Sequence, residues 1–444
     1  MPSHIHLPPA MFLVKDSVSH PVNVHNLIAY PRFTAIPAIV KLTYVKPAAS
    51  GGAGPGTSIF TSPSPPHKPT SNQFSIHNSA FSIILSPMIL AGIDEAGYGP
   101  LLGPLVVSCA AFEVPDFSQP APLPLTVPEL PCLWKLLSQA VLKKNTARSQ
   151  GRLLIADSKV VHNLSNGDRL LERGVLAFLP PSPTASENQD TTLDLAQLVA
   201  RFGCSDHGLG DHPWYEHPKS PIALPYWCDA GDLRLARTMV RAAGLKAGVR
   251  LKCLRSALVC EKRFNEMLGR TNNKATALIS ITLYHLYYLH EHFGHLGLVV
   301  GVDKQGGRDH YTQLLLSTFP EASLKVLCED DGGSSYQLTE SHSATPHVPE
   351  SSDNDPSGGG RGRQTIIHFR AKGETHFMAT ALASMTCKYL RELCMTQFNA
   401  WWGARIPGLV PTAGYYQDGT RWLEDVTPHL ERLGVTRADL VRVK

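Results

Sequence analysis

The chain has 444 residues, of which 43% are hydrophobic and 18% charged, which is enough apolar material for one large domain or two ordinary ones. A net charge of +4 is only mildly basic, so it permits a nucleic-acid partner without indicating one. Nine cysteines without a CxxC pair argue against a disulfide framework or a structural zinc site and favour a reducing cytoplasm. No apolar run reaches the roughly 18 residues of a membrane span, and the N-terminus lacks a signal-peptide pattern.

Residues 1–87 differ in composition from the rest of the chain. They are rich in Pro, Ser, His, Gly and Thr and show no sustained helical or strand period. We therefore interpret them as a disordered, low-complexity extension. Met88 stands directly before the first convincing strand, so we expect the natural product to start there.

From Met88 onward, apolar β-like runs alternate with helical segments, which favours an α/β fold. Strands are expected at 89–93, 105–114, 153–156, 298–302, 324–328 and 365–370. Helices are expected over most of 233–268 and at 275–290, 311–319, 375–402 and 422–433, giving a helical C-terminal part over 375–444. Two polar stretches, 180–226 and 331–363, are interpreted as surface insertions, the second as a loop.

Acidic residues follow or end three of the expected strands. Asp94 and Glu95 come after the first strand, Asp303 ends the strand at 298–302, and Glu374 follows the strand at 365–370. Carboxylates brought together repel and raise one another's pKa, and a bound divalent cation removes that cost. Oxygen ligands suit Mg²⁺ or Mn²⁺, and two such ions about 4 Å apart catalyse phosphodiester hydrolysis. Singly, each acid would more often be an ordinary turn former, so the prediction depends on their joint arrangement.

Basic residues are unevenly distributed. Residues 231–274 hold eleven Lys and Arg against three Asp and Glu, and residues 361–405 hold seven against two. Such clusters can follow a phosphate backbone, or they can be solvated helix faces. A His-rich stretch (His285, His290, His292, His295) lies on an expected apolar helix, so we interpret it as helix packing rather than metal ligation.

Several motifs together resemble the type 2 ribonuclease H family, in its ribonuclease HII and HIII branches. They are GIDEAGYGPLLGPLVVSCAAF (92–112), ADSK (156–159), VGVDKQGG (300–307), AKGETHFMATALASMTCKYLRE (371–392) and, more weakly, AGYYQDGTRWL (413–423). The resemblance covers most of 88–444, with insertions between motifs. It implies a ribonuclease H-like mixed β-sheet flanked by helices.

The resemblance also implies a metal site. Asp94, Glu95 and Asp303 match the first three metal-binding and catalytic carboxylates of the family. Glu374 stands where type 2 enzymes have Asp, and the HIII branch also uses Glu there. Asp330 and Asp331, on the loop after a different strand, are the alternative candidates for the fourth ligand.

Substrate contacts are implied by the same motifs. Gly97 and Gly99 match the glycines whose backbone approaches the ribose 2′-hydroxyl. Tyr98 between them replaces the family's Arg or Lys, so it either stacks on a base or sugar or packs over the turn. Phosphate and substrate contacts are implied for further residues: Lys159, Ser384, Lys388, Arg391 and Tyr415.

The sequence therefore predicts a cytoplasmic, monomeric endonuclease that uses two Mg²⁺ or Mn²⁺ ions. It would cut the RNA strand of RNA–DNA hybrids, or ribonucleotides embedded in DNA, and leave 5′-phosphomonoesters. Because Tyr98 replaces a basic residue, a nuclease of the same fold with another nucleic-acid substrate is an alternative. A third interpretation is a nucleic-acid-binding protein without catalytic activity.

Overall fold

The computed structural model describes residues 87–115, 127, 130–146, 149–179, 195–203, 208–215, 223–305, 307–341 and 362–443. It also describes two short antiparallel strands, β1 (Met11–Phe12) and β2 (Val22–Asn23). The extension expected over 1–87 lies outside the described residues apart from residue 87 and these two strands. Within the described part, no helix is long and apolar enough to cross a membrane.

A mixed sheet of seven strands forms the centre of the fold, in the order β7-β4-β3-β8-β11-β10-β9. The three central strands, β3, β8 and β11, run parallel to one another, and the outer pairs are antiparallel. Its strands are β3 (Met88–Ala96), β4 (Leu105–Val114), β7 (Arg250–Val259), β8 (Leu298–Asp303), β9 (Ser323–Asp330), β10 (Gly333–Glu340) and β11 (Arg363–Arg370). A separate parallel pair consists of β5 (Val141–Leu142) and β6 (Leu153–Leu154). The predicted α/β class is confirmed.

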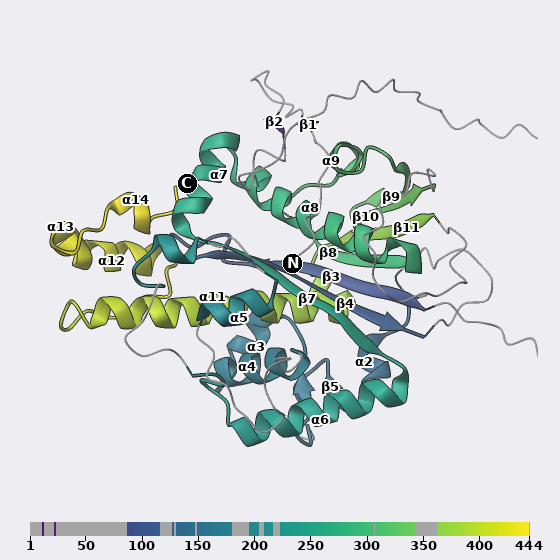
Figure 1. The fold of residues 1–444 in the computed structure, drawn as a ribbon, viewed down its shortest axis with the longest axis horizontal. Helices are drawn as coiled ribbons and strands as arrows, with labels where there is room; N and C mark the ends of the chain where they lie inside the picture. Colours follow the sequence, from purple (N-terminus) through teal and green to yellow (C-terminus); the bar gives the residue numbers. More distant parts are fainter. Residues whose placement is uncertain are drawn as a thin grey trace, which may run out of the picture. The chain divides into compact units, whose positions relative to one another are not determined.

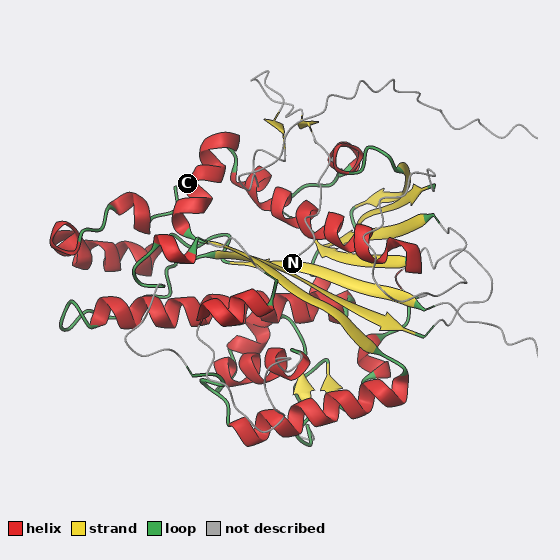
Figure 2. Cartoon of the chain, viewed as in Figure 1, coloured by secondary structure: helices red, strands yellow, loops and turns green. Residues whose placement is uncertain are grey.

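Helices cover both faces of the sheet (Figures 1 and 2). One layer contains α7 (Glu261–Thr271), α8 (Lys274–Phe293) and α9 (Thr312–Thr318). The other contains α3 (Ser158–His162), α4 (Gly167–Phe178), α5 (Leu195–Arg201), α6 (Ala230–Ala247) and α11 (Met378–Gly403). Shorter helices are α2 (Leu133–Leu136), α10 (Gly373–His376), η2 (Leu209–Asp211) and η3 (Gly294–Leu296). The C-terminal helices are α12 (Tyr416–Val426), η4 (Thr427–His429), α13 (Leu430–Leu433) and α14 (Arg437–Leu440).

Strand β3 shows why the sheet is buried on both faces. Ile89 and Ile93 belong to the hydrophobic core on the α8 side, whereas Leu90 belongs to the core on the α11 side. Side chains of a strand alternate between faces, so a nearly continuous apolar run is what a strand between two helical layers needs. Asp94 and Glu95 follow this apolar run directly, near the C-terminal end of β3.

Two secondary-structure predictions were wrong. Residues 250–259 were expected within a helix, but they form β7, which pairs with β4 along its length. Residues 333–340 were expected within a loop, but they form β10, with Tyr336 and Leu338 fully buried. In both cases pairing with a neighbouring strand overrides a weak local pattern. The helix expected over 422–433 also breaks, because Pro428 lies in η4 between α12 and α13.

Candidate active site

Strand register brings the first acidic residues together. Ile93 of β3 pairs with Val302 of β8, and the two strands are parallel. Asp94 and Asp303 are the next residues along each strand, so they lie at the same edge of the sheet. Parallel strands with their carboxyl ends at one edge present their following side chains to a common point.

Three carboxylates meet at this edge. Oxygen atoms of Asp94, Glu95 and Asp303 lie within 4.8 Å of one another, although Asp303 is distant in sequence from the other two. Asp94 is 7% exposed, and Glu95 and Asp303 are partly buried. One Glu95 oxygen, Oε2, is buried and has no hydrogen-bond partner among the described residues. A buried, unpaired oxygen of this kind requires an explanation, and a cation would supply one.

Glu374 is brought next to this group by a short helix. It lies in α10, and the backbone N–H of Gly373 donates a hydrogen bond to Asp303 Oδ1 at 2.9 Å. Glu374 is 8% exposed, and its charge acts on Glu95. The cluster whose ligand atoms all lie within 4.8 Å contains the other three residues and not Glu374.

Two glycines let this helical region approach the sheet. Gly92 of β3 pairs with Gly301 of the neighbouring strand β8. A Cβ on Gly92 would lie 2.0 Å from the Thr380 backbone nitrogen, and one on Gly301 would lie 2.3 Å from the Phe377 ring. Thr380 Oγ1 donates a hydrogen bond to the Gly301 carbonyl at 2.9 Å. The start of α11, and α10 before it, can therefore lie directly against the strands that carry the acids.

The carboxylates strongly perturb one another. Burial and the charges of Glu95 and Asp303 hold the pKa of Asp94 well above its usual value. Burial and the charge of Asp303 raise the pKa of Glu95 to about 7. Burial also raises the pKa of Asp303 and of Glu374. Such perturbation is typical of functional sites, and a bound cation would offset the repulsion among these carboxylates.

Lys159 and Asp157 also lie close to the acidic group. The positive charge of Lys159, on the first turn of α3, lowers the pKa of Glu95, Asp303 and Glu374. Asp157 Oδ1 accepts a hydrogen bond from the Lys159 backbone N–H at 2.8 Å, and its charge raises the pKa of Asp303 and Glu374. Asp157 was not predicted to be a site residue, although it lies within the ADSK motif at 156–159.

A second residue was missed. The Gln305 side chain lies near Glu95 and lowers the pKa of that carboxyl, and its amide donates a hydrogen bond to Thr282 Oγ1 at 2.6 Å. Gln305 is 7% exposed, so a buried residue bonded to α8 borders the acidic cluster. The sequence did contain a signal for Gln305, because this residue stands two positions after Asp303 in the VGVDKQGG motif.

The turn after β3 carries the expected substrate residues. Gly97 has φ +87°, and a Cβ there would lie 2.4 Å from the Pro104 carbonyl oxygen, so this position needs glycine for its backbone. Gly99 is exposed, and a Cβ there would meet nothing within 4 Å. Tyr98 is partly buried and packs against the α8-side core, and burial and the Glu95 charge raise its pKa.

Tyr415 lies beside the same turn. The Gly414 carbonyl accepts hydrogen bonds from the N–H groups of Leu101 and Leu102, at 2.7 and 3.1 Å. The segment before α12 is thereby tied to the loop that follows Gly99. Tyr415 and Tyr416 are 50% and 56% exposed. The two neighbouring tyrosines therefore both present ring surface to solvent close to the Gly97–Gly103 turn.

The residues expected to contact phosphate have different environments. Arg391 is 1% exposed and donates to the carbonyls of Pro104, Leu102 and Ala413, so its proposed phosphate contact is wrong. Lys388 is 8% exposed and forms an ion pair with Glu392 at 2.5 Å. The Ser384 hydroxyl donates to Ser158 Oγ at 3.0 Å. Of the expected phosphate ligands, Lys159 is the one with an exposed side chain.

The alternative fourth ligands lie elsewhere. Asp330 is at the end of β9, on the far edge of the sheet from β3, and it accepts hydrogen bonds from Cys328 Sγ and the Gly332 N–H. Asp331 follows it in the exposed β9–β10 turn. Strand order thus separates both residues from Asp303, because β11 and β10 lie between β8 and β9.

Many basic residues are already paired within the fold. Arg250 and Lys252 form ion pairs with Glu113, and Arg363 forms ion pairs with Glu291 and Glu340. Among the histidines, His285 Nε2 donates to the Val107 carbonyl at 3.0 Å, which agrees with a packing role. The basic excess predicted from the sequence is therefore partly neutralised, and it does not by itself define a nucleic-acid surface.

Comparison with known proteins gives distant structural similarities. No family model matches the chain, and no curated protein matches it. A chain of the PCNA:RNase HII complex from Archaeoglobus fulgidus is similar at a TM-score of 0.32 and 13% identity, covering 80% of this chain and 93% of that chain. Ribonuclease H2 from Pyrococcus horikoshii OT3 is similar at 0.31 and 12%, covering 80% and 92%. Bst-RNase HIII in complex with Mn²⁺ is similar at 0.30 and 12%, covering 84% and 72%.

At these TM-scores the similarities carry no argument for the activity of this chain. The mixed sheet flanked by helices and the meeting of three carboxylates at its edge are features of the chain itself. Any statement about reaction and substrate therefore depends on the geometry and chemistry of the acidic cluster.

Proposed function

We propose that the chain is a metal-dependent endonuclease that hydrolyses the RNA strand of RNA–DNA hybrids or ribonucleotides embedded in DNA. The supporting observation is that Asp94, Glu95 and Asp303 present oxygens within 4.8 Å of one another at one sheet edge. Glu374 lies beside them in α10, whose Gly373 N–H donates a hydrogen bond to Asp303 Oδ1. The motifs around these residues resemble type 2 ribonuclease H, which supplies the substrate class.

The donor set fits hard divalent cations. Carboxylate oxygens are the ligands that Mg²⁺ and Mn²⁺ prefer. Asp94, Glu95, Asp303 and Glu374 would hold the ions, and Glu95 Oε2 is buried without a hydrogen-bond partner among the described residues. Bound ions would activate water and stabilise charge on the leaving oxygen. These residues would hold the ions in fixed positions, because strands β3 and β8 and helix α10 carry them.

Substrate contacts are proposed for the residues around the turn. Gly99 leaves open space where the backbone could approach a ribose. Exposed Tyr415 could stack on a base, and exposed Lys159 could pair with the scissile phosphate. Lys388, Ser384 and Tyr98 are more buried, so we assign them to holding the site rather than to direct contact.

Another nucleic-acid substrate remains the second candidate. Tyr98 takes the place of a basic residue, and a tyrosine cannot pair with phosphate as Arg does. A panel of duplexes that differ only in one 2′-hydroxyl separates the two activities. A catalytically silent binder is the third candidate, and it predicts neither cleavage nor stabilisation by metal. We expect a monomer in a reducing cytoplasm for all three.

The central experiment is cleavage of a duplex that contains one ribonucleotide, with Mg²⁺ or Mn²⁺. Wild type should cut at the ribonucleotide and leave 5′-phosphate ends, and Asp94→Asn should lose at least about a hundredfold in rate. Tyr98→Arg should retain or increase the rate. If wild type leaves every hybrid intact with both metals and Asp303→Asn changes nothing, the proposal is wrong.

A further inference from the structure

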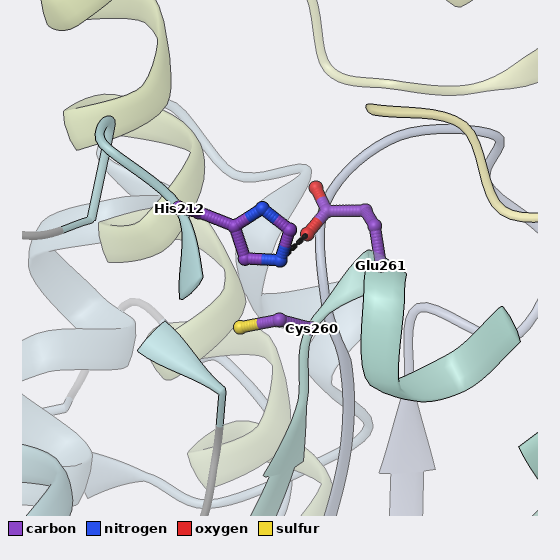
Figure 3. Close-up of side chains that lie close together, drawn as sticks. All are labelled: His212, Cys260 and Glu261. Carbon is purple, nitrogen blue, oxygen red and sulfur yellow. Dashed lines mark ion pairs between the residues drawn. The ribbon is translucent and has the colours of Figure 1, made fainter. Parts of the chain in front are cut away.

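A second group of potential ligands lies apart from the strand-end carboxylates. His212, Cys260 and Glu261 are each 0% exposed, and one ligand atom of each lies within 4.8 Å of the others. His212 follows η2, whereas Cys260 and Glu261 form the junction between β7 and α7. Figure 3 shows the three side chains converging from these two segments.

The group leaves buried polar atoms unsatisfied. Both ring nitrogens of His212 and Oε2 of Glu261 have no hydrogen-bond partner among the described residues. His212 Nε2 lies 3.8 Å from Glu261 Oε2, which is too long for a hydrogen bond. A buried polar group without a hydrogen-bond partner destabilises the fold. The 3.8 Å ion pair that Figure 3 marks is the interaction these atoms have among the described residues, and it leaves their hydrogen-bonding capacity unused.

The surroundings of the imidazole are aromatic. His212 stacks on Trp214 with ring centroids 5.0 Å apart and meets Tyr215 edge-on at 5.8 Å. These rings offer His212 no strong hydrogen-bond acceptor in place of the missing one. They also fix the ring plane, so the imidazole is held with one edge toward Glu261 and Cys260.

We propose that His212 Nε2, Cys260 Sγ and Glu261 Oε2 bind a zinc-class divalent ion. A mixed nitrogen, sulfur and carboxylate set favours Zn²⁺ over Mg²⁺ or Ca²⁺. Bonds of about 2.0–2.3 Å require ligand atoms roughly 3.3–3.7 Å apart, so the 3.8 Å pair needs only a small contraction. On binding, the Cys260 thiol releases its proton to solvent, and the thiolate and carboxylate balance the ion's two charges. Water can take the fourth position.

The position of the group suggests a structural ion. The other Glu261 oxygen, Oε1, accepts hydrogen bonds from the Gly103 N–H at 2.9 Å and from the Tyr215 hydroxyl at 3.3 Å. Gly103 closes the turn that begins at Gly97. An ion at this point would therefore fasten the segment around His212 to the base of that turn. This proposal differs from the expectation, drawn from the number and spacing of the cysteines, that argued against a structural zinc site.

An ion pair without metal is the competing explanation. The charge of buried Arg442 also acts on Glu261, so this carboxylate has a cation nearby even without a bound metal. Arg442 does not provide a partner for His212, whose ring nitrogens would stay unsatisfied. The two explanations differ in whether the Cys260 thiolate forms a bond to a metal ion.

The test uses the full chain, purified without chelators. We expect about one zinc ion per chain after dialysis, and, in protein reconstituted with Co²⁺, a near-ultraviolet thiolate-to-cobalt absorption band. Cys260→Ser should remove this band and weaken zinc retention at least about tenfold. Cys328→Ser, at a partly exposed thiol outside the group, is the matched control and should keep the band.

The double variant Asp94→Asn with Asp303→Asn separates the two metal sites, and it should also keep the band. Wild-type protein that shows no cobalt–thiolate band would overturn the proposal without any variant having to fold. A band that persists in Cys260→Ser would also overturn it, because another thiol would then be the ligand.

Discussion

Gly97 and Gly99 lie in one turn but differ in what surrounds them. Gly97 has a positive φ and no room for a Cβ, whereas Gly99 faces open space. We predict that Gly97→Ala lowers the free energy of unfolding by about 2 kcal/mol. Gly99→Ala should change stability by less than about 0.5 kcal/mol but reduce cleavage up to about a hundredfold, because a methyl group would displace the ribose. Urea unfolding and single-turnover cleavage measure the two effects.

The opposite pattern would contradict this assignment. If Gly99→Ala cleaves at the wild-type rate, the backbone at that position does not approach the substrate. Gly97→Ala serves as the control for nonspecific damage, since its loss of activity should follow its loss of folded protein.

Single residues also show where sequence reasoning reaches its limit. The three clustered carboxylates were predicted because each stands at the end of an apolar strand, a pattern visible locally. The burial of Arg391 was not, because its partners are carbonyls of Pro104, Leu102 and Ala413. A long-range contact to backbone leaves no trace in residue type. The sequence around an arginine on a helix after the site looks the same whether the side chain contacts phosphate or lies in the protein interior.

At the scale of elements, Glu172 connects three parts of the fold. This α4 residue is 0% exposed and accepts hydrogen bonds from the N–H groups of Tyr226, Trp227 and Cys228, at 2.7, 2.6 and 2.7 Å. The Tyr389 hydroxyl of α11 donates to it at 3.2 Å. Glu172→Gln places an amide N–H against these donors, so we predict a loss of about 3 kcal/mol in urea unfolding. The exposed Glu431→Gln should change stability by less than about 0.5 kcal/mol.

A Glu172→Gln variant as stable as Glu431→Gln would show that the 226–228 segment does not depend on this carboxylate.

Packing against α11 explains a difficulty of prediction, because Trp214 lies against Phe398 and Trp402 of that helix. Residues 180–226 were interpreted as a surface insertion from their proline and polar content, yet Trp214 within them is 1% exposed. The proline and polar content of a segment predicts that it is a connection between regular elements. Whether its side chains are buried depends on the elements it packs against, such as α11.

Predicted elements agreed with the structure where apolar period and length were both strong. Helix α8 and strand β8 are examples, since each carries a long or β-branched apolar run. The edge strand β7 was predicted as helix, because its irregular order of buried and partly exposed residues lacks the strict alternation that identifies a strand. Edge strands have one solvent-facing side and little intrinsic signal, so their pairing partner decides their conformation.

At the scale of the whole molecule, two buried histidines should make stability depend on pH. Burial and nearby arginine charge lower the pKa of His285 to about 3 and of His368 to about 4. The unfolded chain, with histidine pKa near 6.5, then binds the proton first as pH falls. The contribution of each histidine to the free energy of unfolding should be fully present above about pH 6.5. Below that pH the free energy of unfolding should decline by about 1.4 kcal/mol per pH unit for each histidine. Urea unfolding at about pH 7 and about pH 5 measures the decline, and His285→Gln should reduce it by about 2 kcal/mol. Equal pH dependence in wild type and variant would contradict the burial-based account.

Adding metal should reverse which protein is more stable, the wild type or an Asp303→Asn variant of the acidic cluster. Without metal, the crowded carboxylates repel, so Asp303→Asn should be more stable than wild type by about 1 kcal/mol while its Oδ1 still accepts the Gly373 N–H. With Mn²⁺ at about a hundred times its Kd, wild type should gain about 2.7 kcal/mol and the variant much less. Asp330→Asn, on the far edge strand, should follow wild type in both conditions. Thermal unfolding with and without metal gives all of these values, and a wild-type chain that gains nothing from Mg²⁺ or Mn²⁺ would favour the silent binder over the nuclease.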